Sequence, residues 1–111
     1  MGALNKNIYP LRTRIAGEMA VVKGFVHHKH PGYRDFSPAG EKRGLVGEHF
    51  AREINRAKIF FTDGSIYKYP VAKYFEVLAC NTLLLAPGSA ELRDLGFIDR
   101  KTFVEINKRN Y

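Results

Sequence analysis

Three histidines near the middle of the first half of the chain suggest metal chemistry. They stand at His27, His28 and His30, in the pattern His-His-x-His. If residues 20–28 form a strand, His28 and His30 share one of its faces, and two imidazoles can then point toward one ion. No cysteine or carboxylate stands beside them, and two imidazoles alone make a weak site. We therefore expect no bound metal.

The single cysteine, Cys80, predicts packing and not catalysis. It ends an apolar helical pattern, and no base stands next to it in the sequence that could activate a thiolate. One cysteine cannot form an internal disulfide, which is typical of proteins from the reducing cytoplasm. We expect a cytoplasmic protein in which Cys80 lies on the buried side of its helix.

A turn of polar residues and a glycine could contact a ligand. Residues 62–65 read Thr-Asp-Gly-Ser and follow a short apolar strand pattern. In α/β proteins, ligands bind at the carboxyl ends of the strands, beside the N-termini of the helices that follow. The next helical pattern begins at Pro70, which suits a first helical turn because proline lacks an N–H. The turn and this helix are expected to meet at one edge of a sheet.

The elements that would position these residues alternate along the second part of the chain. Helical spacing and capping residues predict three helices, over 47–57, 70–80 and from Ser89 to Leu95. Continuous apolar runs predict three strands, over 58–62, 82–86 and 102–106. Such alternation is typical of a parallel sheet covered on both sides. It predicts an α/β fold, a Rossmann-like three-layer α/β/α unit with a mainly parallel sheet.

The first part of the chain is less regular. Residues 12–19 predict a short helix, and the mixed pattern of residues 20–28 predicts one more strand. Prolines and glycines interrupt residues 24–44. Asn81 and Gly96 follow predicted helices and are expected to end them in the left-handed conformation.

Size and charge limit the classes of protein that fit. The chain of 111 residues predicts a single domain over residues 1–111, with no apolar run long enough to span a membrane and no export signal. Its net charge is +7. Residues 1–44 hold eight basic and three acidic residues, so most of the excess lies there. A basic first part favours an anionic partner, such as a nucleic acid or a phosphorylated small molecule.

The run from Tyr69 to Ala86, YPVAKYFEVLACNTLLLA, resembles the core motif of the group 1 glycosyltransferases. That motif is a helix reading K-x-F-E-x-(hydrophobic)-A-(small)-G, followed by a strand. The chain is most similar to the subgroup related to the spore-maturation glycosyltransferase-like proteins. Three flanking motifs fit this subgroup in order and spacing: Tyr9–Arg12, His30–Tyr33 and Glu91–Phe97. The resemblance covers residues 8–107.

Two positions depart from the family pattern. Lys68 stands eight residues before Glu76, where the family has a glutamate. Asn81 stands where the family has a glycine.

The resemblance implies a fold and a function. In this family two Rossmann-like domains face each other across a cleft, the GT-B arrangement, and the chain resembles part of the C-terminal, donor-binding domain. It implies binding of a UDP- or GDP-linked sugar for glycosyl transfer to an acceptor that the sequence does not identify, with no metal cofactor. A second copy of the chain or a partner chain would supply the missing domain and the general base.

The resemblance also assigns roles to residues. Glu76 would hold the ribose of the donor, and its place in the Tyr9–Arg12 motif favours Arg12 at the phosphates. Lys73, in the first turn of the predicted helix, is the alternative cation for the phosphates. The turn at residues 62–65 would lie at the edge of the cleft, and His30 would contact donor or acceptor. The expected donor-binding residues are therefore Arg12, His30, Thr62, Gly64, Ser65, Lys73 and Glu76.

Two other functions fit the sequence. The chain could be a small nucleic-acid-binding module that uses scattered basic and aromatic residues: Lys23, Lys29, Tyr33, Arg34, Phe36, Lys42 and Arg43. The absence of helix-turn-helix, zinc or RNP-type motifs disfavours a nucleic-acid partner. Alternatively, the chain is a folded remnant without catalysis, with exposed apolar surface that favours dimerisation.

Overall fold

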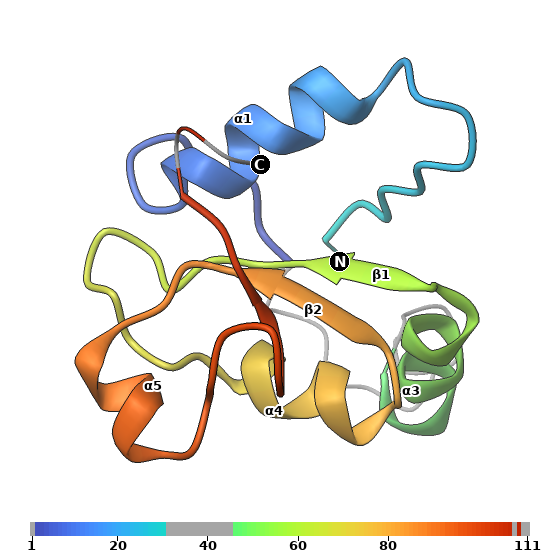
Figure 1. The fold of residues 1–111 in the computed structure, drawn as a ribbon. Helices are drawn as coiled ribbons and strands as arrows, with labels where there is room; N and C mark the ends of the chain where they lie inside the picture. Colours follow the sequence, from blue (N-terminus) through green and yellow to red (C-terminus); the bar gives the residue numbers. More distant parts are fainter. Residues whose placement is uncertain (1, 31–45, 108, 110–111) are drawn as a thin grey trace.

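A small parallel sheet forms the centre of the chain (Figure 1). The computed structural model describes residues 2–30, 46–107 and 109. The strands β1 (Ile59–Phe61), β2 (Leu83–Ala86) and β3 (Val104–Glu105) lie in the order β1-β2-β3. Both neighbouring pairs are parallel, with Phe60 opposite Leu84 and Leu85 opposite Val104. The predicted parallel sheet is confirmed.

Four helices accompany the sheet in the described residues: α1 (Pro10–Met19), α3 (Gly47–Arg56), α4 (Ala72–Ala79) and α5 (Ala90–Asp94). The helices α4 and α5 each connect one strand to the next. In Figure 1, α1 lies over one face of the sheet, and the other three helices lie toward the opposite face. The chain is therefore a mixed α/β protein, and the predicted order of helices and strands from residue 47 onward is confirmed.

Local signals in the sequence explain where several helices begin and end. Pro10 occupies the first turn of α1. The Ser89 hydroxyl accepts the N–H of Leu92 at 3.2 Å and so caps α5. Asn81 has a φ of 55° and Gly96 a φ of 87°, and both therefore end their helices in the left-handed region as predicted.

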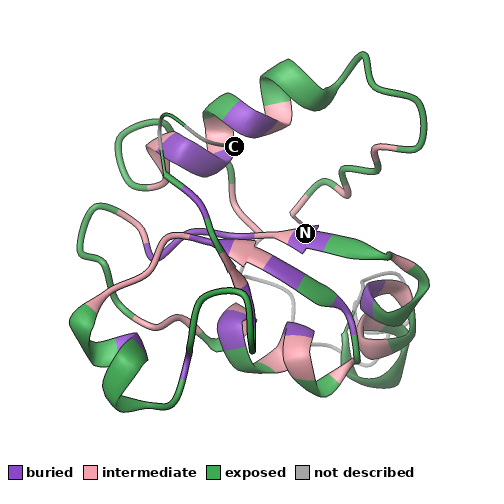
Figure 2. Ribbon diagram, in the orientation of Figure 1, coloured by how far each residue is buried: buried purple, intermediate pink, exposed green. Residues whose placement is uncertain are grey.

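Successive residues of the strands build a core on each side of the sheet. Leu84 and Ala86 pack toward α4 with Val77, and these three side chains are fully buried. Leu85 points the other way and packs against a smaller cluster that includes Leu11 of α1 and Ile106. Figure 2 shows the buried residues on the inner sides of α1 and α4. The half-buried Cys80 packs against the larger core, in agreement with a packing role.

The strand predicted over residues 20–28 is wrong. Residues 20–24 form turns in which the N–H of Val22 donates to Met19 and that of Phe25 donates to Val22. Gly24 has a φ of 89°, which breaks an extended conformation. Val21 is 90% exposed. Valines favour strands only where a neighbouring strand and a core are present, and among the described residues no strand pairs with this segment.

Among the described residues, no helix has the length and apolar character needed to cross a membrane.

Candidate functional site

The carboxyl ends of the three strands meet at one edge of the sheet, which is where ligands bind in α/β proteins. Residues 62–69 follow β1 there and residues 87–89 follow β2. The buried Tyr74 of α4 reaches this edge and donates its hydroxyl to the Pro87 carbonyl at 2.9 Å. Burial, followed by the negative charge of Asp63, raises the pKa of Tyr74, so the phenol remains a hydrogen-bond donor. This edge is the candidate site.

A buried ion pair joins α1 to the end of β1. Arg12 Nη2 lies 3.1 Å from Asp63 Oδ1, and the two side chains are 10% and 5% exposed. The same nitrogen donates to the Thr62 hydroxyl at 3.1 Å and to the Asp63 carbonyl at 3.0 Å. The backbone N–H of Arg12 donates to Asp63 Oδ2 at 3.0 Å. Asp63 therefore caps the first turn of α1 as well as balancing the guanidinium charge.

This network gives Arg12 a structural task. Arg12 and Thr62 are in contact, as a phosphate site would require. The Arg12 guanidinium, however, already forms an ion pair with Asp63. The guanidinium also lies 4.1 Å from the centre of the Tyr9 ring and donates to the Ala3 carbonyl at 3.4 Å. A phosphate at Arg12 would have to displace Asp63 and its buried hydrogen bonds. Asp63 lies in the predicted turn, but no local sequence pattern indicates that it pairs with a residue 51 positions away.

Gly64 and Ser65 close a tight turn. A Cβ on Gly64 would lie 2.7 Å from the Tyr69 carbonyl oxygen, so only glycine fits this close approach. The N–H of Tyr69 donates to the Gly64 carbonyl at 3.0 Å. Ser65 has a φ of 65°, and its hydroxyl accepts the N–H of Tyr67 at 3.2 Å. Both residues thus shape the loop beside the candidate site.

Lys73 and Glu76 form a second, separate group on α4. Lys73 Nζ lies 2.6 Å from Glu76 Oε2 and 4.2 Å from the centre of the Phe50 ring of α3. The Glu76 side chain is 41% exposed. In the described parts of the chain, no hydrogen bond or ion pair links this group to Arg12 or Thr62. Arg12 of α1 and the Lys73–Glu76 pair of α4 thus belong to helices that lie on opposite faces of the sheet (Figure 1).

The histidine segment lies beside α3. His28 Nε2 is 3.0 Å from Glu53 Oε1, and Arg56 Nη1 is 2.7 Å from Glu53 Oε2. His30 is half-buried at the end of the irregular segment. In residues 2–30, 46–107 and 109, no three His, Cys, Asp or Glu side chains gather as a metal site would require. Five of the residues predicted for nucleic-acid binding lie outside the described residues: Tyr33, Arg34, Phe36, Lys42 and Arg43.

Acidification is expected to weaken the contact between this segment and α3. The hydrogen bond from His28, followed by that from Arg56, lowers the pKa of Glu53 below its ordinary value of 4.5 although partial burial opposes this. The ionised carboxylate therefore favours the folded state. This contribution to the free energy of unfolding is fully present above the ordinary pKa and is lost as the pH falls through the lower, folded value. Urea unfolding at a series of pH values from about 6 to about 3 measures it.

The matched variants are Glu53→Gln and Glu48→Gln. The first removes the titrating group, and its stability should fall less on acidification than that of the wild type. The second removes an exposed carboxylate that pairs with Arg52 on the same helix, and it controls for the loss of a surface charge. Identical acid dependence in the wild type and Glu53→Gln would contradict the assignment.

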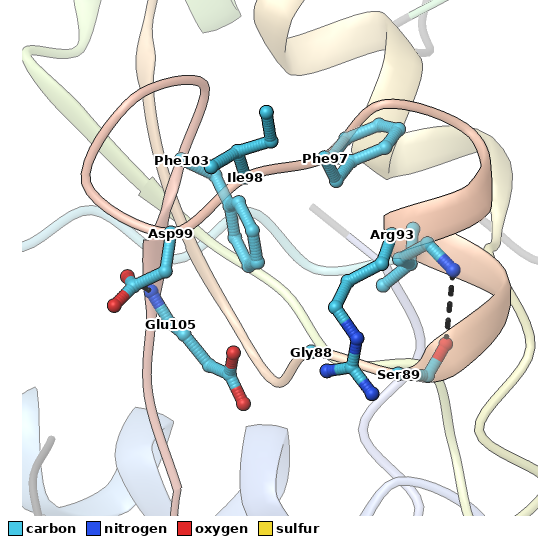
Figure 3. A pocket seen from close by; sticks show the side chains of 9 residues that line it. Gly88, Ser89, Arg93, Phe97, Ile98, Asp99, Phe103 and Glu105 are labelled. Carbon is cyan, nitrogen blue, oxygen red and sulfur yellow. Dashed lines mark hydrogen bonds between the residues drawn. The ribbon is translucent and has the colours of Figure 1, made fainter.

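A hollow that sequence reasoning missed lies between α5 and β3. It has a volume of about 190 Å³ and is lined by Gly88, Ser89, Leu92, Arg93, Phe97, Ile98, Asp99, Phe103 and Glu105 (Figure 3). None of the predicted donor-binding residues lines it. The sequence predicts the helix over residues 89–95, its end at Gly96 and the strand over residues 102–106, but not how residues 97–105 fold back onto this helix.

A second hollow of about 370 Å³ lies beside α1, where Thr13 and His27 contribute to its lining. The Thr13 hydroxyl is buried without a hydrogen-bond partner. Burial, followed by neighbouring positive charge, lowers the pKa of His27. The lining is otherwise apolar, so this hollow offers few groups that could orient a ligand.

Comparisons of this chain with models of protein families, with curated proteins and with solved structures find no match.

Proposed function

We propose that the chain is a donor-binding module of a GT-B glycosyltransferase, with a Rossmann-like three-layer arrangement that holds a UDP- or GDP-linked sugar. The proposal rests on the motif residues quoted above. The observation that carries it best is the state of Glu76 on α4. Its carboxylate is fixed by Lys73 at 2.6 Å but is still 41% exposed. A carboxylate that is held in place and open to solvent can accept hydrogen bonds from both hydroxyls of a ribose.

The phosphates would bind at the start of α4. The N-cap residue of this helix, Val71, makes no side-chain cap, and no described side chain accepts from the N–H groups of the first turn. Such a terminus favours a bound anion. Lys73, in the first turn, adds a positive charge. Arg12 would then support the fold under the site, because Asp63 already balances its charge.

A protein partner would complete the enzyme. The segment after α1 exposes Val21, Val22 and Val26, which are unfavourable in contact with water. A second copy or a partner chain that covered them could supply the acceptor half and the general base. The chain would then be an incomplete enzyme by itself, located in the cytoplasm.

An amide-shift NMR titration with UDP and with GDP, at physiological salt, tests the nucleotide site. We expect localised shifts at residues 62–65 and 72–76 with one of the two nucleotides. Glu76→Gln should weaken the affinity of the chain for that nucleotide about tenfold, which corresponds to about 1.4 kcal/mol of binding free energy. Glu48→Gln, on the exposed face of α3, is the matched control and should bind as the wild type does.

Two results would overturn the proposal. One is a well-dispersed spectrum that neither nucleotide perturbs. The other is unchanged nucleotide affinity in Glu76→Gln, which would remove the ribose-binding role of Glu76.

A further inference from the structure

We infer that the hollow between α5 and β3 binds a single neutral sugar ring. This inference rests on the chemistry of the hollow itself and needs no nucleotide site. The floor is apolar and aromatic: Leu92, Phe97 and Phe103 are all buried there. The two phenylalanine rings meet edge to face, with their centres 5.9 Å apart. Only a small part of these side chains is open to the hollow, and the half-exposed Ile98 extends the apolar surface that the C–H groups of a ligand would contact.

Charged groups without partners stand around this floor. The side chains of Arg93 and Glu105 make no hydrogen bond or ion pair with any described residue. In Figure 3 the guanidinium and the Glu105 carboxylate lie on either side of Gly88. Asp99 adds a second carboxylate, which does have partners: one oxygen accepts the N–H of Glu105 at 2.7 Å, and the other lies 3.9 Å from Arg100 Nε. The rim thus offers both hydrogen-bond donors and acceptors.

Gly88 makes room for the carboxylate. A Cβ at this position would lie 2.5 Å from Glu105 Oε2, so a side chain there would push the carboxylate away. The backbone of Gly88 is not in the left-handed region, and alanine can therefore adopt it without strain. The absence of a side chain at residue 88 is what allows the Glu105 carboxylate to lie at the hollow.

Hydrogen bonds hold the loop over residues 97–103, which lines the hollow, in a defined conformation. The N–H of Ile98 donates to the Thr102 hydroxyl at 2.8 Å, and the N–H of Arg100 donates to the Phe103 carbonyl at 2.8 Å. These bonds fix the loop between Phe97 and Phe103. A ligand therefore meets a formed site and does not have to order the loop on binding.

Size and charge select the class of ligand. A volume of about 190 Å³ lies below the roughly 300–1,000 Å³ of pockets for drug-sized ligands and so favours a small ligand over a nucleoside diphosphate. The carboxylates of Asp99 and Glu105 face the guanidinium groups of Arg93 and Arg100, so the rim is close to neutral and favours an uncharged ligand. In the described residues no third His, Cys, Asp or Glu joins the two rim carboxylates, as a metal site would require. A neutral sugar ring fits: its hydroxyls donate to Asp99 and Glu105 and accept from Arg93, while its C–H groups lie against the apolar lining.

Amide-shift NMR titration of the full chain with D-glucose, D-galactose and N-acetyl-D-glucosamine tests the inference. We expect at least one of them to give saturable shifts at Gly88, Ser89 and residues 97–105. Arg93→Gln and Glu105→Gln should each weaken that affinity about fivefold or more, because each removes a charge-assisted hydrogen bond. The matched controls are Arg52→Gln and Glu48→Gln, two exposed residues of α3, and they should bind as the wild type does.

The variant Gly88→Ala tests sugar binding in the hollow while leaving the fold unchanged. Its spectrum should remain native while sugar affinity falls about fivefold or more, since the new methyl group displaces only the end of the Glu105 side chain. The absence of saturable shifts with all three sugars would overturn the inference, as would unchanged affinity in both charge variants. Titration with UDP reports on residues 62–65 and 72–76 independently, so failure of the nucleotide site and failure of the sugar site give different spectra.

Discussion

Asp63→Ala is expected to lower the free energy of unfolding by about 3–5 kcal/mol. The substitution leaves the Arg12 guanidinium, which is 10% exposed, without its counter-charge. It also removes the acceptor of the Arg12 backbone N–H in the first turn of α1. Breaking one half of a buried ion pair costs far more than removing both halves, because the remaining charge stays desolvated.

Urea unfolding of three variants checks this expectation. Asp63→Asn retains an oxygen that can accept the N–H of Arg12 and should cost less than alanine. The double variant Arg12→Met/Asp63→Ala should recover part of the loss, since no unpaired charge remains. Asp94→Ala, at an exposed position of α5, is the control and should change stability by less than about 0.5 kcal/mol. A loss in Asp63→Ala no larger than this control would show that the pair is not important for the fold.

Phe97→Ala is expected to cost about 3–5 kcal/mol. Phe97 follows α5, and its ring meets three others edge to face: Tyr74 at 5.9 Å, Phe75 at 5.4 Å and Phe103 at 5.9 Å between centres. The ring therefore ties α4 to the loop that leads into β3. Its removal leaves a cavity in the larger core, and these contacts are lost together.

Denaturant unfolding again measures the effect, with Phe75→Ala as the matched control. Phe75 belongs to the same aromatic group but is 46% exposed, so its truncation should cost clearly less. Phe97→Leu retains most of the volume and should lie between the wild type and Phe97→Ala. Similar losses in Phe97→Ala and Phe75→Ala would contradict the central position of Phe97 in the core.

Much of the fold after residue 46 could be predicted because its signals are local. Apolar spacing identifies α3 and α4, and Ser89 identifies the start of α5. The turn residues Asn81 and Gly96 mark where helices end. The segment after α1 could not be read in this way. Its valines favour a strand, but a strand needs a neighbour to pair with, and pairing depends on residues far away in the sequence.

The site was harder to predict than the fold. Arg12 and Thr62 are in contact, but the Arg12 guanidinium that was expected to bind a ligand phosphate pairs with Asp63. This pairing spans 51 residues and leaves no local pattern in the sequence. The hollow between α5 and β3 depends on how residues 97–103 fold back toward Gly88. Only tertiary structure brings Arg93 and Glu105 to the same opening.

The ion pair between α1 and β1 also bears on how the chain opens. From β1 to β3, each strand pairs with the next strand along the chain, about 19–24 residues away. By contrast, α1 is held by Asp63, 51 residues away, and by a small cluster around Leu11, Ile15 and Ile106. Closing the long loop between α1 and Asp63 costs conformational entropy and is slow, and few apolar contacts of α1 offset this cost. Amide hydrogens of α1 would therefore exchange with solvent through a local opening, well before those of β2 are released by global unfolding. Folding would follow the reverse order, with α1 docking last onto a sheet that has already formed.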